Sequence, residues 1–212
     1  MKRHGSRVAL VYVGAIFILC LVTCAGCLLA CNALQERPPE RGFETDELFI
    51  DVSVFPPEWS ADPAGPQRHT GQAPLGGGPE TLQRRVLTFD VGDGHGGAFE
   101  KIYRMASIKV AAKEFERQIT LWFPKGKYWT PWERPTELKF ESSIADQFRV
   151  ACAHDTARSD LAQKCHFIGQ YEEYLVWFST DMSPDFMTYQ DLEHVLEAID
   201  ERMEHYLMEG AE

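Results

Sequence analysis

The feature that most constrains this chain is the 24-residue stretch from Val8 to Cys31, which contains no charged residue. Basic residues cluster immediately before it, at Lys2, Arg3 and Arg7. A bilayer core is roughly 30 Å thick, and a helix of about 20 apolar residues crosses it. The stretch therefore predicts a membrane attachment, with the basic end inside and the remainder of the chain on the extracytoplasmic side.

Two interpretations of this stretch stay open. It is longer than the apolar region of about 7–15 residues in a cleaved secretory signal, which favours an uncleaved transmembrane helix. However, Leu28-Leu29-Ala30-Cys31 resembles the lipobox of bacterial lipoproteins. The resemblance implies cleavage before Cys31 and lipidation of that residue, with Cys27 in Cys24-Ala25-Gly26-Cys27 as the alternative site. Residues 1–31 are thus a lipoprotein leader or a transmembrane anchor, and both give a cell-membrane protein with an exported domain.

The charge balance restricts the partners of the exported part. The whole chain has 21 basic and 32 acidic residues, a net charge of −11. Without Lys2, Arg3 and Arg7 the balance is 18 against 32, or −14. Nucleic-acid binding depends on Lys and Arg side chains that neutralise phosphates, so no nucleic-acid partner is expected.

Residues 32–46 are polar and contain prolines, which predicts a flexible spacer. A single exported domain is expected over residues 47–210, with a Pro/Gly-rich insert without regular structure at 58–81. The β-rich run from Leu48 to Phe55 predicts a first strand ended by Pro56-Pro57.

Hydrophobic periodicity predicts further elements. A helix opens at Ser107 with an apolar face that includes Ile108, Phe115 and Trp122, and a second spans Thr188–Leu207 with a capping box of Thr188 and Asp191. Strands are expected at Leu82–Val91, Ala98–Arg104, Leu138–Phe140, Gln147–Ala153 and within Lys164–Thr180, where the run Tyr174–Phe178 is apolar on both faces and indicates a central strand.

The predicted fold class is α+β, with a mostly antiparallel sheet of four to six strands and two packed helices, preceded by the N-terminal hydrophobic membrane segment. The element order of hairpin, helix, hairpin, helix and the motif Phe55-Pro56-Pro57-Glu58-Trp59 are loosely similar to PsbP-like α/β/α sandwich domains. That resemblance implies a fold and no particular activity.

Cys152 and Cys165 are the two cysteines outside the N-terminal stretch, 13 positions apart in consecutive predicted strands. An even pair of cysteines in an extracytoplasmic domain predicts a structural disulfide. The alternatives are buried thiols or a redox-active pair, although the C-x-x-C spacing of catalytic pairs is lacking.

Four bulky rings, Trp122, Tyr128, Trp129 and Trp132, crowd a short segment rich in prolines. Such rings close the end of a sheet, or they form a stacking surface for a sugar or a docking surface for a protein. They are the best binding candidate in the sequence.

Spacings typical of nucleophilic or metal sites are lacking, so no catalytic residue, metal or cofactor is predicted. The glycine-rich segment Gly92–Gly97 formally matches a dinucleotide motif, but a returning strand follows it where that motif needs a helix. We therefore expect a non-catalytic binding domain at the cell surface, for a protein or glycan ligand. The alternatives are an exported hydrolase of envelope polymers and a structural or assembly subunit of an envelope complex.

Overall fold

The computed structural model describes residues 39–68, 80–88, 96–126, 128–157 and 163–209. They form a seven-stranded, wholly antiparallel sheet in the order β1-β3-β4-β7-β6-β5, with β2 paired to β3. The strands are β1 (Trp59–Ala61), β2 (Gln67–Arg68), β3 (Glu80–Thr88), β4 (Gly97–Arg104), β5 (Gln147–His154), β6 (Gln163–Tyr171) and β7 (Tyr174–Met182). The predicted α+β class and antiparallel sheet are confirmed, whereas the predicted count of four to six strands is exceeded because the short β1 and β2 also join the sheet.

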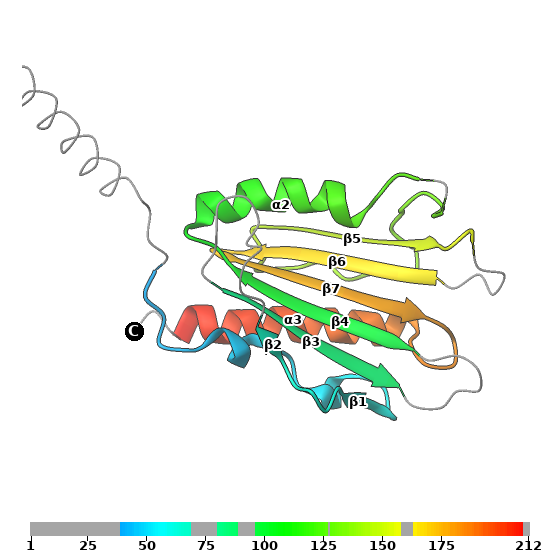
Figure 1. Ribbon diagram of the computed structural model, residues 1–212, viewed down its shortest axis with the longest axis horizontal. Helices are drawn as coiled ribbons and strands as arrows, with labels where there is room; N and C mark the ends of the chain where they lie inside the picture. The colour runs from blue at the N-terminus through cyan, green and yellow to red at the C-terminus, as the bar shows by residue number, and fades with distance from the viewer. Residues whose placement is uncertain (1–38, 69–79, 89–95, 127, 158–162, 210–212) are drawn as a thin grey trace, which may run out of the picture. The chain divides into compact units, whose positions relative to one another are not determined.

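Helices cover the two faces of the sheet differently. Helix α3 (Tyr189–Glu209) passes behind β7, β4 and β3, while α2 (Ile108–Trp122) runs along the β5–β6 side (Figure 1). Side chains alternate along each strand, so Ile102, Phe167 and Phe178 belong to the core under α3, and Tyr103, Ile168 and Trp177 belong to the core on the other side. We call these the α3 face and the α2 face.

Both helices begin where the sequence predicts. The Ser107 hydroxyl accepts a hydrogen bond from the Val110 amide at 3.3 Å and caps α2. The predicted capping box is also confirmed, because the Asp191 carboxylate accepts from the Thr188 amide while the Thr188 hydroxyl accepts from the Asp191 amide. The predicted apolar face of α2 is wrong at Ile108, which is 48% exposed because it lies in the first turn, at the end of the helix.

The predicted central strand is confirmed. Residues Tyr174–Thr180 of β7 are all buried, and β7 lies between β4 and β6. The run Lys164–Thr180 divides into β6 and β7 at a turn of two glutamates, Glu172 and Glu173. Glu172 has the left-handed φ of 51°, and its amide donates to the Asp146 carboxylate at 2.8 Å, which helps to fix the turn.

The strand predicted from Leu48 to Phe55 is wrong. The segment forms two short 3-10 helices instead, η1 (Thr45–Leu48) and η2 (Val52–Val54). The Asp51 carboxylate accepts from the Ser53 amide at 2.8 Å, a local turn that competes with an extended backbone. Leu48, Phe49 and Ile50 are consecutive and all buried, which one face of a strand cannot achieve.

The short strand predicted at Leu138–Phe140 is also wrong. Leu138 and Phe140 point inward as the alternation predicts, and both are buried. The Lys139 amide, however, donates to the side chain of Glu193 on α3, so this backbone is not part of the sheet.

Part of the predicted spacer is packed into the folded unit. Arg41 binds both carboxylate oxygens of Glu173 at 2.9 and 2.6 Å and also contacts Glu172. Glu173 is fully buried, and this pairing raises the pKa of Arg41 despite the opposing effect of burial. Residues 39–46 therefore contact the domain, whereas residues 32–38 lie outside the described residues.

The remaining N-terminal predictions fall on residues that are not described. The chain divides into two compact units, Met1–Arg37 and Pro38–Glu212, and the predicted membrane segment lies in the first. From residue 39 onward, no described helix is both long and apolar enough to cross a bilayer. The prediction that 58–81 lacks regular structure is wrong in part, because β1 and β2 pair with β3, which begins at Glu80. Residues 69–79 are not described.

Candidate functional site

The site begins with the disulfide, which is confirmed between Cys152 of β5 and Cys165 of β6. The two residues are directly opposite each other in the register, with Cα atoms 4.0 Å apart. The backbone groups of Cys152 point away from β6 and bind Glu133. The Cys152 carbonyl accepts from the Glu133 amide at 3.1 Å, and the Cys152 amide donates to the Glu133 carbonyl at 2.8 Å. The cysteines therefore form a non-hydrogen-bonded pair, where antiparallel side chains approach most closely.

Further hydrogen bonds along the outer edge of β5 hold residues 128–133, which we call the aromatic segment. The Thr130 amide donates to the His154 carbonyl at 3.0 Å, and the Thr130 hydroxyl accepts from the His154 amide at 2.9 Å. The Thr156 amide donates to the Tyr128 carbonyl at 2.9 Å. Residues 128–133 thus cover an edge strand that would otherwise have unpaired backbone groups. The segment has no regular secondary structure but is fixed to the sheet.

This arrangement leaves a cavity of about 510 Å³ at the end of α2, which we call the aromatic pocket. It is lined by residues 123–126, which follow the last turn of α2, by residues 129–132, and by Arg149 of β5. The rings of Trp129 and Trp132 lie 5.3 Å apart and tilted, and Trp132 meets Phe123 edge to face at 5.6 Å. A concave site of this volume with aromatic walls is typical of small-ligand binding.

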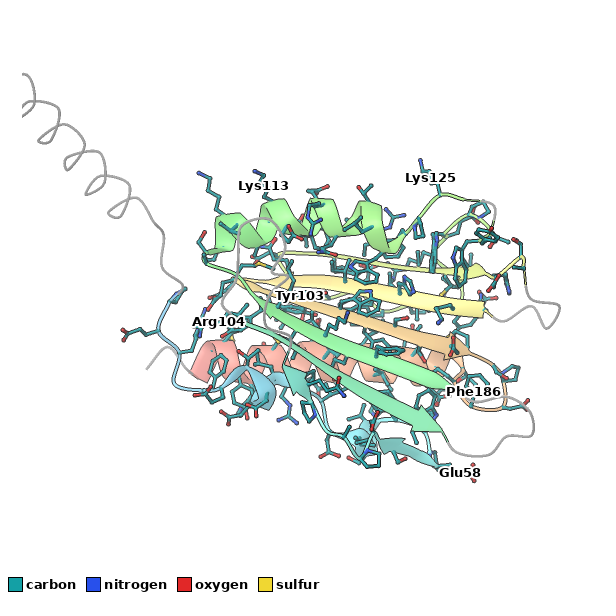
Figure 2. The ribbon with its side chains drawn as sticks, in the orientation of Figure 1. Glu58, Tyr103, Arg104, Lys113, Lys125 and Phe186 are labelled. Atoms are coloured by element: carbon teal, nitrogen blue, oxygen red, sulfur yellow. A yellow bond between two sulfur atoms is a disulfide. The ribbon has the colours of Figure 1, made fainter. Side chains whose placement is uncertain are left out.

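The charged residues that line the aromatic pocket, Lys125 and Arg149, are both positive. The Arg149 guanidinium lies 4.4 Å from the centroid of the Phe123 ring, in cation–π contact. Lys125 is exposed and projects outward from the loop after α2, at the rim (Figure 2). Neither cation has an ion pair with a carboxylate in the described part of the chain. The lining itself contains no carboxylate.

His166 of β6 lies beneath this wall of rings. Its ring is 4.4 Å from that of Trp132, and its Nδ1 donates to the Trp122 carbonyl at 2.6 Å, which satisfies one of the last carbonyls of α2. Burial lowers the pKa of His166 to about 4, against a smaller opposing effect of that hydrogen bond. The imidazole is therefore neutral at pH 7, and it fixes the end of α2 to the sheet.

The α2 face next to the aromatic pocket holds a second group of rings. Trp122 stacks on Trp177 with centroids 4.1 Å apart, and the Lys101 ammonium lies 5.5 and 5.3 Å from the two centroids. Burial lowers the pKa of Lys101. The indole N–H groups of Trp122, Trp132 and Trp177 are buried, and no described residue accepts from them.

The structure divides the four predicted rings. Trp129 and Trp132 line the aromatic pocket, whereas Trp122 packs on the α2 face and helps to close the sheet. Tyr128 is 57% exposed and does not line the pocket. The interpretation that the rings close the sheet thus holds for Trp122, and ligand binding by Trp129 and Trp132 stays a prediction.

Sequence reasoning missed Arg149 as a member of this site. Arg149 is the charged residue in the otherwise β-rich run Gln147–Ala153. A charge inside such a run is the signal that could have identified it, because charged side chains are seldom buried without a partner. Its proximity to Phe123 depends on the packing of α2 and was not predictable from spacing.

Among the described residues, no group of three or more His, Cys, Asp or Glu side chains could hold a metal ion. Cys27 and Cys31, the predicted lipidation sites, lie outside the described residues.

No protein-family model and no curated protein matches the chain. Among solved structures, the chain is similar to the extracellular domain of PknH from Mycobacterium tuberculosis. The identity is 10%, the similarity covers 79% of this chain and 98% of that chain, and the TM-score is 0.45. A likeness at this level bears on neither the activity nor the ligand of this chain, and the resemblances to lipoproteins and to PsbP-like domains stay predictions.

Proposed function

We propose that this chain is a membrane-tethered, non-catalytic binding domain on the extracytoplasmic side, with the aromatic pocket as its ligand site. The observation that carries the proposal is the aromatic pocket itself: about 510 Å³, walled by Trp129, Trp132 and Phe123, and built on a segment that hydrogen bonds and a disulfide hold in place. A preformed wall of rings binds with little loss of conformational entropy.

The aromatic pocket lies at the end of the folded unit opposite to the Arg41 contact. Arg41 fixes the start of the described chain to the β6–β7 turn, at one end of the sheet. Lys125, at the pocket rim, lies beyond the opposite end of α2 (Figure 2). The disulfide supports an oxidising compartment.

The hydrolase alternative needs a pair of carboxylates beside the rings, separated by up to about 10 Å. The lining of the aromatic pocket has two cations and no carboxylate, so this pocket gives that alternative no support. The assembly alternative needs a large exposed apolar patch. The exposed large apolar residues that the structure describes include Ile108 and Leu121, which lie at opposite ends of α2.

Binding is tested by co-sedimentation of the full-length chain, in mild detergent, with the insoluble cell-wall fraction of its host. We expect the wild-type chain to sediment and Trp129→Ala to lose most of this binding. Tyr128→Ala is the matched control, because Tyr128 is a neighbouring aromatic residue that does not line the pocket. Equal sedimentation of Trp129→Ala and wild type would remove the pocket from the proposal.

The tether is tested separately by metabolic labelling with a radioactive or clickable fatty acid. Replacing Cys27 and Cys31 together with Ser should abolish the label if either is the lipidation site. A label that is unchanged in the double variant would argue against the lipobox, and an unlabelled wild-type chain that stays in the membrane fraction would leave the uncleaved helix as the tether.

A further inference from the structure

We infer that the ligand of the aromatic pocket is an acidic sugar, a pyranose ring with a carboxylate that pairs with Arg149. This inference deepens the proposed function and rests on it. It begins with a contrast of charge: the chain beyond residue 31 has 32 acidic residues against 18 basic ones, yet the pocket lining has two cations and no acid. Such a local excess of positive charge favours an anionic ligand, although the protein as a whole is acidic. Salt screens the repulsion between the ligand and acidic residues that lie farther away than the Debye length of about 8 Å.

Arg149 is the group that would recognise the anion. Its guanidinium is half-buried in the lining and packs on Phe123 at 4.4 Å, which fixes its plane. None of the described carboxylates forms an ion pair with it. By contrast, the buried Arg41 has two glutamates. Arginine binds a carboxylate through two parallel hydrogen bonds, so a fixed and unpaired guanidinium suits that group.

The rings define the rest of the ligand. Trp129 and Trp132 line the pocket with tilted rings that pack against each other, with centroids 5.3 Å apart. The electron-rich face of an indole attracts the weakly positive C–H groups of a sugar ring. The Arg149 guanidinium together with these apolar rings matches a sugar acid better than a neutral or cationic ligand.

A peptide suits the site less well. An extended peptide gains most of its affinity by pairing with a free sheet edge. Here the edge of β5 is already occupied by residues 128–133, through Thr130 and Glu133. The pocket is a cavity at the end of a helix and not a groove along a strand.

The test is a calorimetric titration of the full-length chain, in mild detergent, with trigalacturonic acid and with its fully methyl-esterified form. The two probes have the same sugar rings and differ in charge. We expect the acid to bind about tenfold more tightly than the ester, because a charge-assisted hydrogen bond is worth more than a neutral one. Arg149→Gln should remove this difference, and Arg149→Lys should keep part of it. The matched control is Lys113→Gln, which changes an exposed cation of α2 outside the pocket lining and should alter the difference by less than about threefold.

Equal affinity for acid and ester would overturn the inference while leaving the proposed pocket in place. Failure of both sugars to bind would also overturn it, and co-sedimentation with the cell wall would then decide the proposed function independently. Tighter binding of an Asp-Pro repeat peptide than of the sugar acid would overturn it in favour of a protein ligand. If Arg149→Gln does not fold, salt titration of the wild-type chain replaces it: affinity for the acid should fall with salt while affinity for the ester stays constant.

Discussion

The α3 face and the α2 face are built from the same strands but differ in how Tyr171 and Lys101 are paired. On the α3 face, the buried Tyr171 hydroxyl donates to Asp200 at 2.6 Å, within a core whose side chains are almost entirely inaccessible. On the α2 face, Lys101 lies on two tryptophans without a carboxylate partner among the described residues, and three indole N–H groups have no acceptor there. Buried polar groups are normally paired, so these groups of the α2 face reduce the stability of the fold.

We interpret the α3 face as the part of the molecule that stabilises the fold, and the α2 face as the part that is available for binding. α3 covers its face with an apolar stripe, and Leu192, Val195, Leu196, Ile199 and Met203 are all buried against the sheet. α2 covers the β6 side of the other face, and Phe99 and Lys101 of β4 stay half-exposed. Four predictions test how far the comparison extends.

The largest expected effect comes from matched phenylalanine truncations on the two faces. Phe178 lies on the α3 face and is fully buried, so Phe178→Ala should reduce the free energy of unfolding by about 3–5 kcal/mol. Phe99 lies on the α2 face and is half-exposed, so Phe99→Ala should cost about 1 kcal/mol. Urea denaturation of the full-length chain measures both values, and equal losses would contradict the comparison.

Charged groups give the second test. Glu173 is fully buried and pairs with Arg41, so Glu173→Gln leaves a buried cation with weaker partners and should cost about 3 kcal/mol. Lys101 has no such partner, and Lys101→Met keeps the packing on Trp177 while it removes a desolvated charge. We expect it to change stability by less than about 1 kcal/mol, since the lost cation–π contact offsets the gain. A larger loss for Lys101→Met than for Glu173→Gln in thermal unfolding would refute this distinction.

The disulfide gives the third test, because it joins two strands within the α3-face core and also supports the aromatic segment. In the chain-entropy account, a disulfide that closes a loop of 13 residues stabilises the folded chain by about 3 kcal/mol. Reduction of this disulfide should therefore lower the melting temperature by roughly 6–12 °C. Cys152→Ser combined with Cys165→Ser should reproduce this shift in the absence of reductant. An unchanged melting temperature after complete reduction would show that the crosslink adds no stability.

The smallest effect near neutral pH comes from His166. Its pKa in the folded chain is about 4, below the ordinary value of 6.5, so the unfolded chain binds the proton more readily. Its contribution to stability is therefore complete above pH 6.5 and is lost as the pH falls towards 4, by up to about 3 kcal/mol. His166→Asn keeps a donor for the Trp122 carbonyl but does not titrate, so its stability should fall less steeply over that range. Parallel pH profiles for the two proteins would contradict the burial of a neutral imidazole.

Sequence patterns predict the α3 face well because they reflect periodic burial. The apolar run at Tyr174–Phe178, the stripe on α3 and the opposed cysteines all follow from spacing alone. Spacing fails where local hydrogen bonds replace a regular ladder, as with the Asp51 turn inside the predicted strand at Leu48–Phe55. It fails again at the β6–β7 turn, because Glu172-Glu173 lacks the glycine or asparagine that usually signals such a turn.

The candidate site was predictable only in part. The aromatic segment is visible as an aperiodic cluster of rings, but the assignment of Trp129 and Trp132 to a pocket wall and of Trp122 to the sheet depends on how residues 128–133 pair with β5. Arg149 reaches the pocket through the packing of α2 against β6, a contact between segments more than 20 residues apart. Long-range packing of this kind leaves no signal in local composition.

Hydrogen–deuterium exchange of the full-length chain, with and without soluble cell-wall fragments of its host, tests the division of the two faces most directly. Ligand binding at the aromatic pocket should slow the exchange of amides in residues 123–133 and in β5, and leave those of α3 unchanged. Slower exchange confined to α3 or to residues 45–55, with residues 123–133 unaffected, would contradict the account and place the binding surface elsewhere.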